Sequence, residues 1–311
     1  MIRKWHLKAV IQKTISFMPN GHKINHWFQK NITKGVYLGD EYFYDRLEHV
    51  KHHIGAFSKF CGSIEGKKTL ELGTGWYPVI PFSFFLAGAA EINTLDISNL
   101  TNKEKLKDTI GRFIELIEQD RLKDYIEVKP ERVAILQEVH ETFESLSFEA
   151  ILSKLQINYL IVDARNVQHL ADRSIDLVHS NNTFEHVYPA ILKDILKEFK
   201  RLVKADGLQS HFVDMSDHFA HFDKSINIYN FLQYSNKAWD RVIDNSIQPQ
   251  NRWRFAQFVD LYKSLDIPLT DTEIREGDIE AVKSLKIHSD FSDFNTKELA
   301  ISHCYLYSKE Q

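Results

Sequence analysis

The sequence predicts an α/β protein whose doubly wound, mostly parallel sheet of about seven strands carries an N-terminal helical extension and a cap. Short strand-like runs alternate with helical patterns through the middle of the chain, and this alternation is typical of a parallel sheet. The first of these runs ends at a Gly-Thr-Gly loop, where a strand turns into a helix. The 311 residues, 43% of them hydrophobic, suffice for a large buried core.

Residues 1–62 are predicted to form the helical extension. Seven basic side chains and no acidic one stand within the first 39 residues. The apolar residues that could share parts of one helical face are Trp5, Val10, Ile11, Ile15 and Phe17. This pattern fits an interfacial helix on an anionic membrane, a basic arm for an anionic substrate, or a helix packed on the domain with its lysines in water. We favour the packed helix, and we expect a second helix from Tyr42 to Phe60, before Gly62.

Hydrophobic periodicity defines the elements of the remaining domain, residues 63–311. Strands are expected at 68–72, 91–97, 158–162, 175–179, 208–213, 272–275 and 299–307. Helices are expected at 79–89, 102–120, 189–203 and 255–265, with a turn at Gly207. Residues 121–156 are predicted to be a helical insertion, and residues 215–254 a cap over the carboxyl ends of the strands.

Charge and cysteine content exclude several classes of protein. The net charge of −4 provides no positive field for nucleic acid. The two cysteines, Cys61 and Cys304, are too few for a disulfide framework, so we expect a cytoplasmic protein. No apolar run is long enough to cross a bilayer, and the basic N-terminus lacks a cleavage site, so neither stable membrane insertion nor secretion is predicted. The oligomeric state is left open.

The segment from Glu71 to Gly75, followed by Pro78, predicts which nucleotide the sheet binds. A dinucleotide loop needs a third glycine where Pro78 stands, so binding of a pyrophosphate is disfavoured. The acid at Glu71 would repel a phosphate, but it suits a ligand that carries an ammonium and a sulfonium. The loop Gly73-Thr74-Gly75 therefore favours S-adenosylmethionine.

Acids at the ends of the next two strands support this cofactor. Asp96, followed by Ile97, comes 21 residues after the second glycine of the loop, a spacing at which an acid can accept hydrogen bonds from both ribose hydroxyls. Asp163 could accept from the adenine amino group while the backbone of Ala164 contacts the ring. The carboxyl ends of parallel strands meet at one edge of a sheet, so both acids should line one crevice with the glycine loop and Asn181.

Over residues 67–207 these motifs resemble the class I S-adenosylmethionine-dependent methyltransferase family, whose fold is Rossmann-like. The glycine loop looks like the first motif of the family, and the run that ends at Asn181 looks like its fourth-strand motif. The resemblance implies that Ser180 and Asn181 face the methionine part of the cofactor and the methyl acceptor. Tyr77 departs from the family pattern, which often has a third glycine there, and makes the loop bulkier.

Methyl transfer to a hydroxyl needs a base near the end of the fourth strand. His186, just beyond that end, is one candidate, and its alternative role is to cap or pack beside the next helix. His218 and Asp214, after the fifth strand, are also placed for the acceptor. Together with His221 they would match a two-histidine, one-carboxylate metal site, but a hydrogen-bonded polar lid is favoured and no metal ligand is assigned.

The sequence therefore predicts a S-adenosylmethionine-dependent methyltransferase that acts on a small molecule or a sugar-containing precursor, preferably at oxygen. The run Asn181-Asn182-Thr183-Phe184 lacks the Asn-Pro-Pro-Tyr type of pattern that accompanies amino-group methylation of nucleic acid or protein. Two rivals remain. One is an aminopropyl transferase on the same fold, and the other is a non-catalytic S-adenosylmethionine-binding partner subunit.

Overall fold

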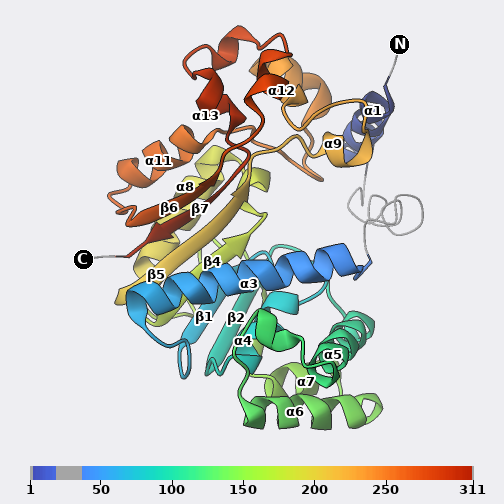
Figure 1. Cartoon of the computed structure of the whole chain (residues 1–311), viewed down its shortest axis with the longest axis vertical. Helices are drawn as coiled ribbons and strands as arrows, with labels where there is room; N and C mark the ends of the chain where they lie inside the picture. The colour runs from blue at the N-terminus through green and yellow to red at the C-terminus, as the bar shows by residue number, and fades with distance from the viewer. Residues whose placement is uncertain (1–2, 19–36, 310–311) are drawn as a thin grey trace.

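The computed structural model describes residues 3–18 and 37–309 (Figure 1). Its centre is a seven-stranded sheet in the order β3-β2-β1-β4-β5-β7-β6, in which β7 runs antiparallel to both of its neighbours and the other pairs are parallel. The strands are β1 (Lys68–Leu72), β2 (Glu91–Asp96), β3 (Ile157–Ile161), β4 (Ile175–Asn181), β5 (Val203–Asp214), β6 (Asp271–Arg275) and β7 (His303–Ser308). This arrangement confirms the predicted fold class.

Two details of the predicted strands are wrong. Gly207 is not a turn, because β5 begins at Val203 and its pairing with β4 shifts register, so that the chain bulges between Val203 and Leu208. The last strand begins at His303 rather than Leu299, which belongs to a short helix that starts after the Asn295 cap.

The helices cover both faces of the sheet and build the cap. The bounds are α1 (Lys4–Ser16), α3 (Asp40–Cys61), α4 (Val79–Leu86), α5 (Lys103–Glu118), α6 (Pro130–Glu141), α7 (Phe148–Lys154), α8 (Pro189–Leu202), α9 (Phe219–Phe222), α10 (Asn236–Ala238), α11 (Phe255–Ser264), α12 (Ile279–Lys283) and α13 (Thr296–Ala300). Short turns of tighter or wider helix include η3 (Phe184–His186), η4 (Asn230–Gln233) and η5 (Trp239–Ile243). Helices α6 and α7 lie within the predicted insertion, and α9, η4, α10 and η5 lie within the predicted cap.

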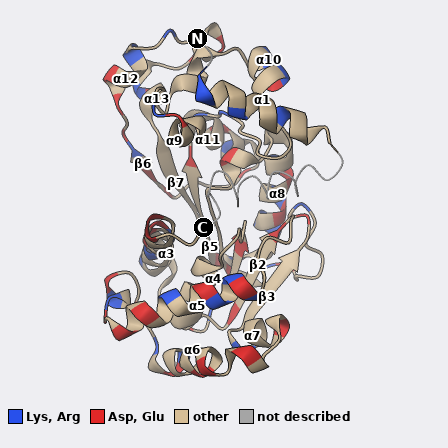
Figure 2. Ribbon diagram, turned by 90° about the vertical axis from the view of Figure 1, so that its right-hand side faces the viewer, with Lys and Arg blue, Asp and Glu red and all other residues tan. Residues whose placement is uncertain are grey.

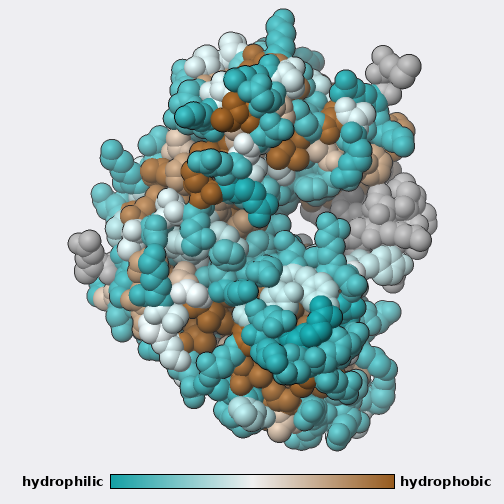
Figure 3. Space-filling view, viewed as in Figure 1, coloured by the Kyte–Doolittle hydropathy of each residue, from teal (hydrophilic) through white to brown (hydrophobic). Residues whose placement is uncertain are grey.

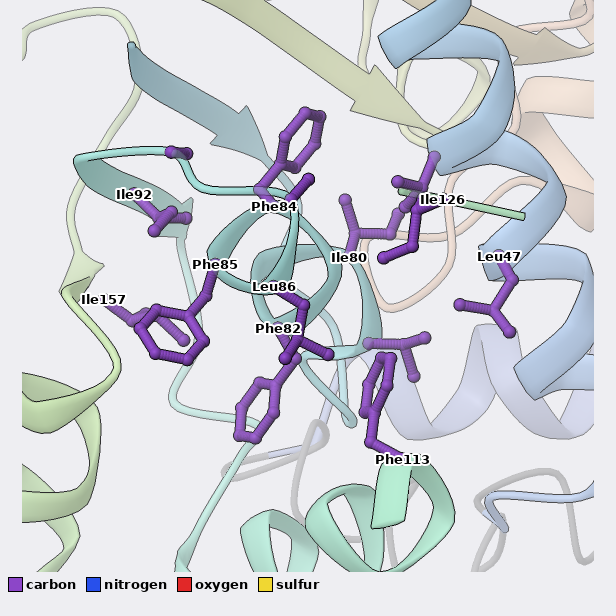
Figure 4. Close-up of a cluster of buried hydrophobic side chains, with 14 of the residues drawn as sticks. Leu47, Ile80, Phe82, Phe84, Phe85, Leu86, Ile92, Phe113, Ile126 and Ile157 are labelled. Atoms are coloured by element: carbon purple, nitrogen blue, oxygen red, sulfur yellow. The ribbon is translucent and has the colours of Figure 1, made fainter. Parts of the chain in front are cut away.

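The larger hydrophobic core lies on the sheet face that α3, α4 and α5 cover. Helix α4 is buried along its whole length, and its rings Phe82, Phe84 and Phe85 have no exposed surface. Figure 4 shows these rings among Ile92 of the sheet and Phe113 of α5. The packing anchors α4, and with it the loop that joins β1 to its N-terminus.

A second core fills the opposite face of the sheet. Leu192, Leu196 and Phe199 recur at helical spacing along α8 and are fully buried, in one cluster with Val178 of β4 and Val213 of β5. Helix α11 adds its own buried side chains to this cluster. The parallel strands are therefore covered on both faces, as a doubly wound sheet requires.

The third core joins the cap to α1, which lies beside α9 of the cap in Figure 1. Trp5 of α1 is fully buried, its ring centroid lies 5.5 Å from that of Phe219, and its backbone N–H donates to the Asp223 carboxylate at 3.1 Å. The packed-helix interpretation of α1 matches this placement. The predicted apolar face is partly wrong, however, because Val10 and Ile11 are exposed. The buried face consists of Trp5, Ala9, Gln12 and Ile15, which the helical period of 3.6 residues aligns.

The two helices of the predicted extension 1–62 lie on different parts of the protein. Helix α1 packs on the cap, whereas α3 packs on the sheet and on α4. The division at residue 62 stays a prediction, and the basic residues Lys23, Lys30 and Lys34 lie outside the described residues. Within the described ranges, each helix is too short or too polar to cross a membrane. The face in Figure 3 is mostly hydrophilic, with smaller hydrophobic areas between polar ones.

Candidate functional site

The carboxyl ends of the parallel strands open onto a cavity of about 1320 Å³. Its lining comes from the β1–α4 loop, the ends of β2, β4 and β5, the segment after β3, and also from α1, α3 and the segment 246–249. In Figure 3 the surface is hollowed between the part that carries α9 and the part that carries α3 and α5. One crevice therefore brings together the glycine loop, Asp96, Asp163 and Asn181, as the sequence predicts.

The glycine loop has a conformation that favours glycine at two positions. Gly73 has φ of +89° and Gly75 has φ of +68°. The N–H of Gly73 donates to the Leu95 carbonyl at 2.8 Å, and the N–H of Gly75 donates to the Asp96 carboxylate at 3.1 Å. A side chain at Gly73 would also come within 2.5 Å of the Thr183 hydroxyl oxygen. The loop backbone is therefore exposed to the cavity with no side chain at its first turn.

Glu71 lies beneath this loop and is 2% exposed. Its carboxyl accepts a hydrogen bond from the Thr94 hydroxyl at 2.7 Å, and that hydroxyl also bonds the hydroxyl of Thr74. Burial raises the pKa of Glu71 to about 8. The group therefore becomes an anion most readily when a cation lies beside it.

Asp96 ends β2 at the cavity wall. Its carboxylate accepts from the N–H of Gly75 and, at 2.9 Å, from the N–H of Ser98. Burial raises the pKa of Asp96, and the backbone donors oppose that shift. Ile97 lines the same cavity with a side chain that is 78% exposed, so this apolar surface is available to a flat ligand.

Asp163 and Ala164 line the cavity after β3, but the acid already has a partner. The Arg165 guanidinium donates to both carboxylate oxygens at 3.0 Å, and this interaction lowers the pKa of Asp163. Ala164 is buried, with its backbone at the cavity. An adenine amino group would have to share Asp163 with Arg165.

Ser180 and Asn181, the two residues at the end of β4 that the family motif assigns to the ligand, point to different sides of the sheet. Asn181 lines the cavity, and its side-chain oxygen accepts a hydrogen bond from His53 Nε2 at 2.9 Å. Its amide nitrogen is buried without a hydrogen-bond partner. Ser180 is not among the cavity residues, because neighbouring residues of a strand face opposite sides. Its hydroxyl is fully buried and bonds His211 Nδ1 at 2.8 Å. Only Asn181 is therefore placed for a ligand.

The acceptor candidates meet on the cap side of the cavity. Asp214, at the end of β5, has His218 and His303 at 3.3 Å and His221 at 4.0 Å from its carboxylate. Burial alone would raise the pKa of Asp214, but the nearby His218 and His303 outweigh it and hold that pKa well below its usual range. Burial would lower the pKa of His218, but the nearby Asp214 carboxylate outweighs burial and raises that pKa. The two side chains lie next to the cavity, where Asp214 would stabilise the imidazolium that His218 forms when it takes up a proton.

His186 completes this cluster. Its Nδ1 bonds the Pro249 carbonyl at 2.7 Å, and burial lowers its pKa to about 4, so the ring is neutral with Nε2 left as an acceptor. Glu185 is buried beside it, both its carboxyl oxygens lack a hydrogen-bond partner, and burial raises its pKa to about 8. Three side chains could together hold a metal ion: Glu185, His186 and His218. Each offers one ligand atom, and these atoms lie within 4.8 Å of one another.

Several residues of the cavity lining were not predicted from the sequence, among them three on helices α1 and α3. Tyr42 and Arg46 stand one turn apart on α3, and the guanidinium carbon lies 4.8 Å from the Tyr42 ring centroid. Lys8 reaches the cavity from α1. The four-residue spacing of Tyr42 and Arg46 places both on one face of the helix and could have indicated a polar site. The sequence pattern of this helix was used only to find its apolar face.

Comparison with known proteins supports the interpretation in part. A family model described as a methyltransferase domain matches residues 111–210. No curated protein matches the sequence. Among solved structures, a Pyrococcus horikoshii protein is 14% identical over 91% of this chain and 98% of its own, with a TM-score of 0.48. A Burkholderia thailandensis 1,6-didemethyltoxoflavin-N1-methyltransferase, solved with S-adenosylhomocysteine, is 10% identical over 94% of this chain and 92% of its own, with a TM-score of 0.45.

Proposed function

We propose that this chain is a class I S-adenosylmethionine-dependent methyltransferase that transfers the methyl group to an oxygen of a small molecule. The methyltransferase-domain match over residues 111–210 and the observed sheet support this enzyme class, and the motifs at the strand ends support S-adenosylmethionine as its cofactor. The observation that carries the finer proposal is the Asp214–His218 pair, which lines the same cavity as the glycine loop. A base and a cofactor loop in one cavity are what hydroxyl methylation needs.

Different residues at the strand ends would bind different parts of the cofactor. When bound, S-adenosylmethionine would supply a methyl group on a sulfonium, from which a neutral thioether departs as a good leaving group. Asp96 is placed to accept from the ribose hydroxyls, the bare backbone at Gly73 allows close approach, and Ala164 with Ile97 offers apolar contact to the adenine. Glu71 and Asn181 would face the charged methionine end. These assignments rest on position at the cavity.

His218 is the better of the two candidate bases. Asp214 raises the pKa of His218 and stabilises the imidazolium that forms when the ring takes a proton from an acceptor hydroxyl. His186 has a lowered pKa and a fixed ring, so it serves as a hydrogen-bond acceptor that positions the hydroxyl. The main contribution of the protein is then to align the acceptor with the methyl group.

A small acceptor fits the space and the charge of the chain. The cavity of about 1320 Å³ exceeds the roughly 300–1,000 Å³ that a single small ligand usually occupies, so it has room for a cofactor and an acceptor together. The net charge of −4 supports an acceptor other than nucleic acid. The scarcity of cysteine supports the proposed cytoplasmic location.

The test is a labelled-methyl transfer screen with metabolite extract fractions as acceptors. We expect wild-type protein to label a small molecule, His218→Ala to lose roughly 10²-fold or more of the rate, and S-adenosylmethionine binding to survive in that variant. His140→Ala, an exposed histidine on α6, is the matched control and should keep full activity.

Other outcomes identify the rivals. If His186→Ala and His218→Ala both keep full activity and a chelator has no effect, neither histidine is the base and no metal assists. Binding of S-adenosylmethionine without any methyl transfer would favour the partner-subunit alternative. Tighter binding of decarboxylated S-adenosylmethionine in isothermal titration would favour the aminopropyl transferase.

A further inference from the structure

Two contacts hold helix α1 against the cap. One lies about one helical turn before Lys8 and the other about one turn after it. Trp5, three residues before Lys8, is buried against Phe219 and bonds Asp223. Gln12, four residues after it, donates from its side-chain nitrogen to the Gln248 side-chain oxygen at 3.1 Å. Residues at this spacing share one helix face, so Lys8 lies on the docked face rather than in the solvent.

Lys8 has no anionic partner within the described part of the chain. Its ammonium lies 4.9 Å from the Phe222 ring centroid and 5.9 Å from that of Phe219, and no hydrogen bond or ion pair joins it to a described residue. Burial lowers the pKa of Lys8. The neighbouring lysines of the helix differ, because Lys4 is exposed and Lys13 donates to the Asp240 carbonyl at 3.0 Å.

A half-buried cation without a partner costs free energy that an incoming anion would recover. Aromatic rings supply part of the compensation, but a cation–π contact leaves the hydrogen-bond donors of the ammonium available. Helix α1, blue at its basic residues in Figure 2, carries no acidic residue that could serve instead.

Lys8 faces the acceptor side of the cavity. It lines the cavity with His186, His218 and Gln248, and the same four residues line a smaller adjoining pocket beneath α1. The nearby Asp214 is already surrounded by three histidines and is not paired with Lys8. The free positive charge at this end is therefore directed at what binds between the cap and the cofactor.

We infer that Lys8 is a specificity-determining residue that binds an anionic group, a carboxylate or a phosphate, of the methyl acceptor. That the anion belongs to the methyl acceptor rests on the proposed function. The anion-binding site itself can be tested without turnover. It explains why an N-terminal helix is docked over the cap: the docking brings one cation to the acceptor. The acceptor class that follows is a small anionic hydroxyl compound.

The first experiment measures turnover on extract fractions with Lys8→Met, Lys8→Arg and the control Lys4→Met. We expect the labelled product of wild-type protein to be retained on an anion exchanger, and Lys8→Met to raise KM for the acceptor fraction by about 10- to 100-fold, the effect of a lost hydrogen bond to a charged group. Lys8→Arg should restore part of the loss, and kcat and cofactor affinity should change little. Pretreatment of the extract with phosphatase abolishes labelling if the anion is a phosphate ester and leaves it intact if the anion is a carboxylate.

The second experiment needs no turnover. The protein saturated with S-adenosylhomocysteine is titrated with inorganic phosphate and with acetate at constant ionic strength, and its unfolding temperature is followed. Stabilisation by either anion in wild type and Lys4→Met, but not in Lys8→Met, supports the subsite even if methyl transfer is never found, in which case the proposed function alone fails. A neutral or cationic labelled product, or equal responses of wild type and Lys8→Met in both experiments, overturns the inference.

Discussion

Asp96 has two tasks at the scale of a single residue. Its carboxylate holds the N–H of Gly75 and the N–H of Ser98, and it lines the cavity where a ribose would lie. A carboxylate held in this way is already oriented before a ligand arrives, so little freedom is lost on binding.

We expect Asp96→Ala to weaken S-adenosylmethionine binding by about 1.5–3 kcal/mol, the scale of a lost hydrogen bond to a charged group. Isothermal titration measures this difference, and circular dichroism checks that the variant is folded. Asp260→Ala, which removes an exposed acid of α11, should bind as wild type does. An unchanged affinity in folded Asp96→Ala would mean that the ribose is held elsewhere.

Glu71 predicts a pH dependence of cofactor binding. Burial raises its pKa to about 8, so the unliganded protein holds Glu71 mostly protonated at neutral pH. A bound cation favours the carboxylate, so binding releases a proton, and affinity should rise with pH by up to about tenfold per unit and level off above about pH 8. The ratio of wild-type to Glu71→Gln affinity, measured by titration from pH 6 to pH 9, removes the titration of the cofactor itself. A constant ratio would show that Glu71 does not sense the cation.

The same pKa shift affects folding with a defined sign. A carboxyl whose pKa is raised in the folded state stabilises the fold while it is protonated, and that stability is lost as pH rises from the usual range of a glutamate towards about 8. Glu71→Gln should therefore gain in unfolding free energy relative to wild type as the pH increases over this interval.

At the scale of an element, the β1–α4 loop depends on glycine at one turn. Gly73 has a positive φ, and a Cβ there would meet Thr183. Gly55 lies in the exposed face of helix α3, with nothing within 4 Å of an added Cβ. The two glycines form a matched pair.

Gly73→Ala should destabilise the protein by about 1 kcal/mol or more and weaken the cofactor, because the backbone strains and Thr183 must move. Gly55→Ala should instead add about 0.5–1 kcal/mol, because alanine loses less chain entropy in a helix. Urea denaturation and titration with S-adenosylhomocysteine measure both effects. A Gly73→Ala variant as stable and as active in binding as wild type would contradict the role given to the loop.

At the scale of the whole molecule, one cavity is bounded by parts of the sheet, by α3 and by the cap with α1. A ligand that binds only the folded chain stabilises all these parts together. S-adenosylhomocysteine at 100 times its Kd should raise the free energy of unfolding by about 2.7 kcal/mol. NAD should not, because Pro78 stands at the start of α4, where a dinucleotide loop needs glycine. Thermal unfolding with each ligand decides the matter, and equal stabilisation by NAD would contradict the cofactor assignment.

The sequence by itself determined the sheet, its flanking helices and the residues at the strand ends, because these depend on local periodicity and on spacing along the chain. Glu71, Gly73, Asp96, Asp163 and Asn181 all follow from this local information and all reach the cavity. The predicted class of enzyme rests on the same motifs.

Tertiary structure alone decided the acceptor side. The pairing of Asp214 with His218, the fixed ring of His186 and the arrival of Lys8 depend on how the cap and α1 fold back over the sheet. Contacts between segments more than 200 residues apart, such as Trp5 with Asp223, leave no periodic pattern in the sequence. Ser180 is a second example, within a strand. Only the structure shows that its side chain bonds His211 of β5 and does not reach the cavity. Local chemistry is encoded by neighbours along the chain, and the acceptor site by neighbours in space.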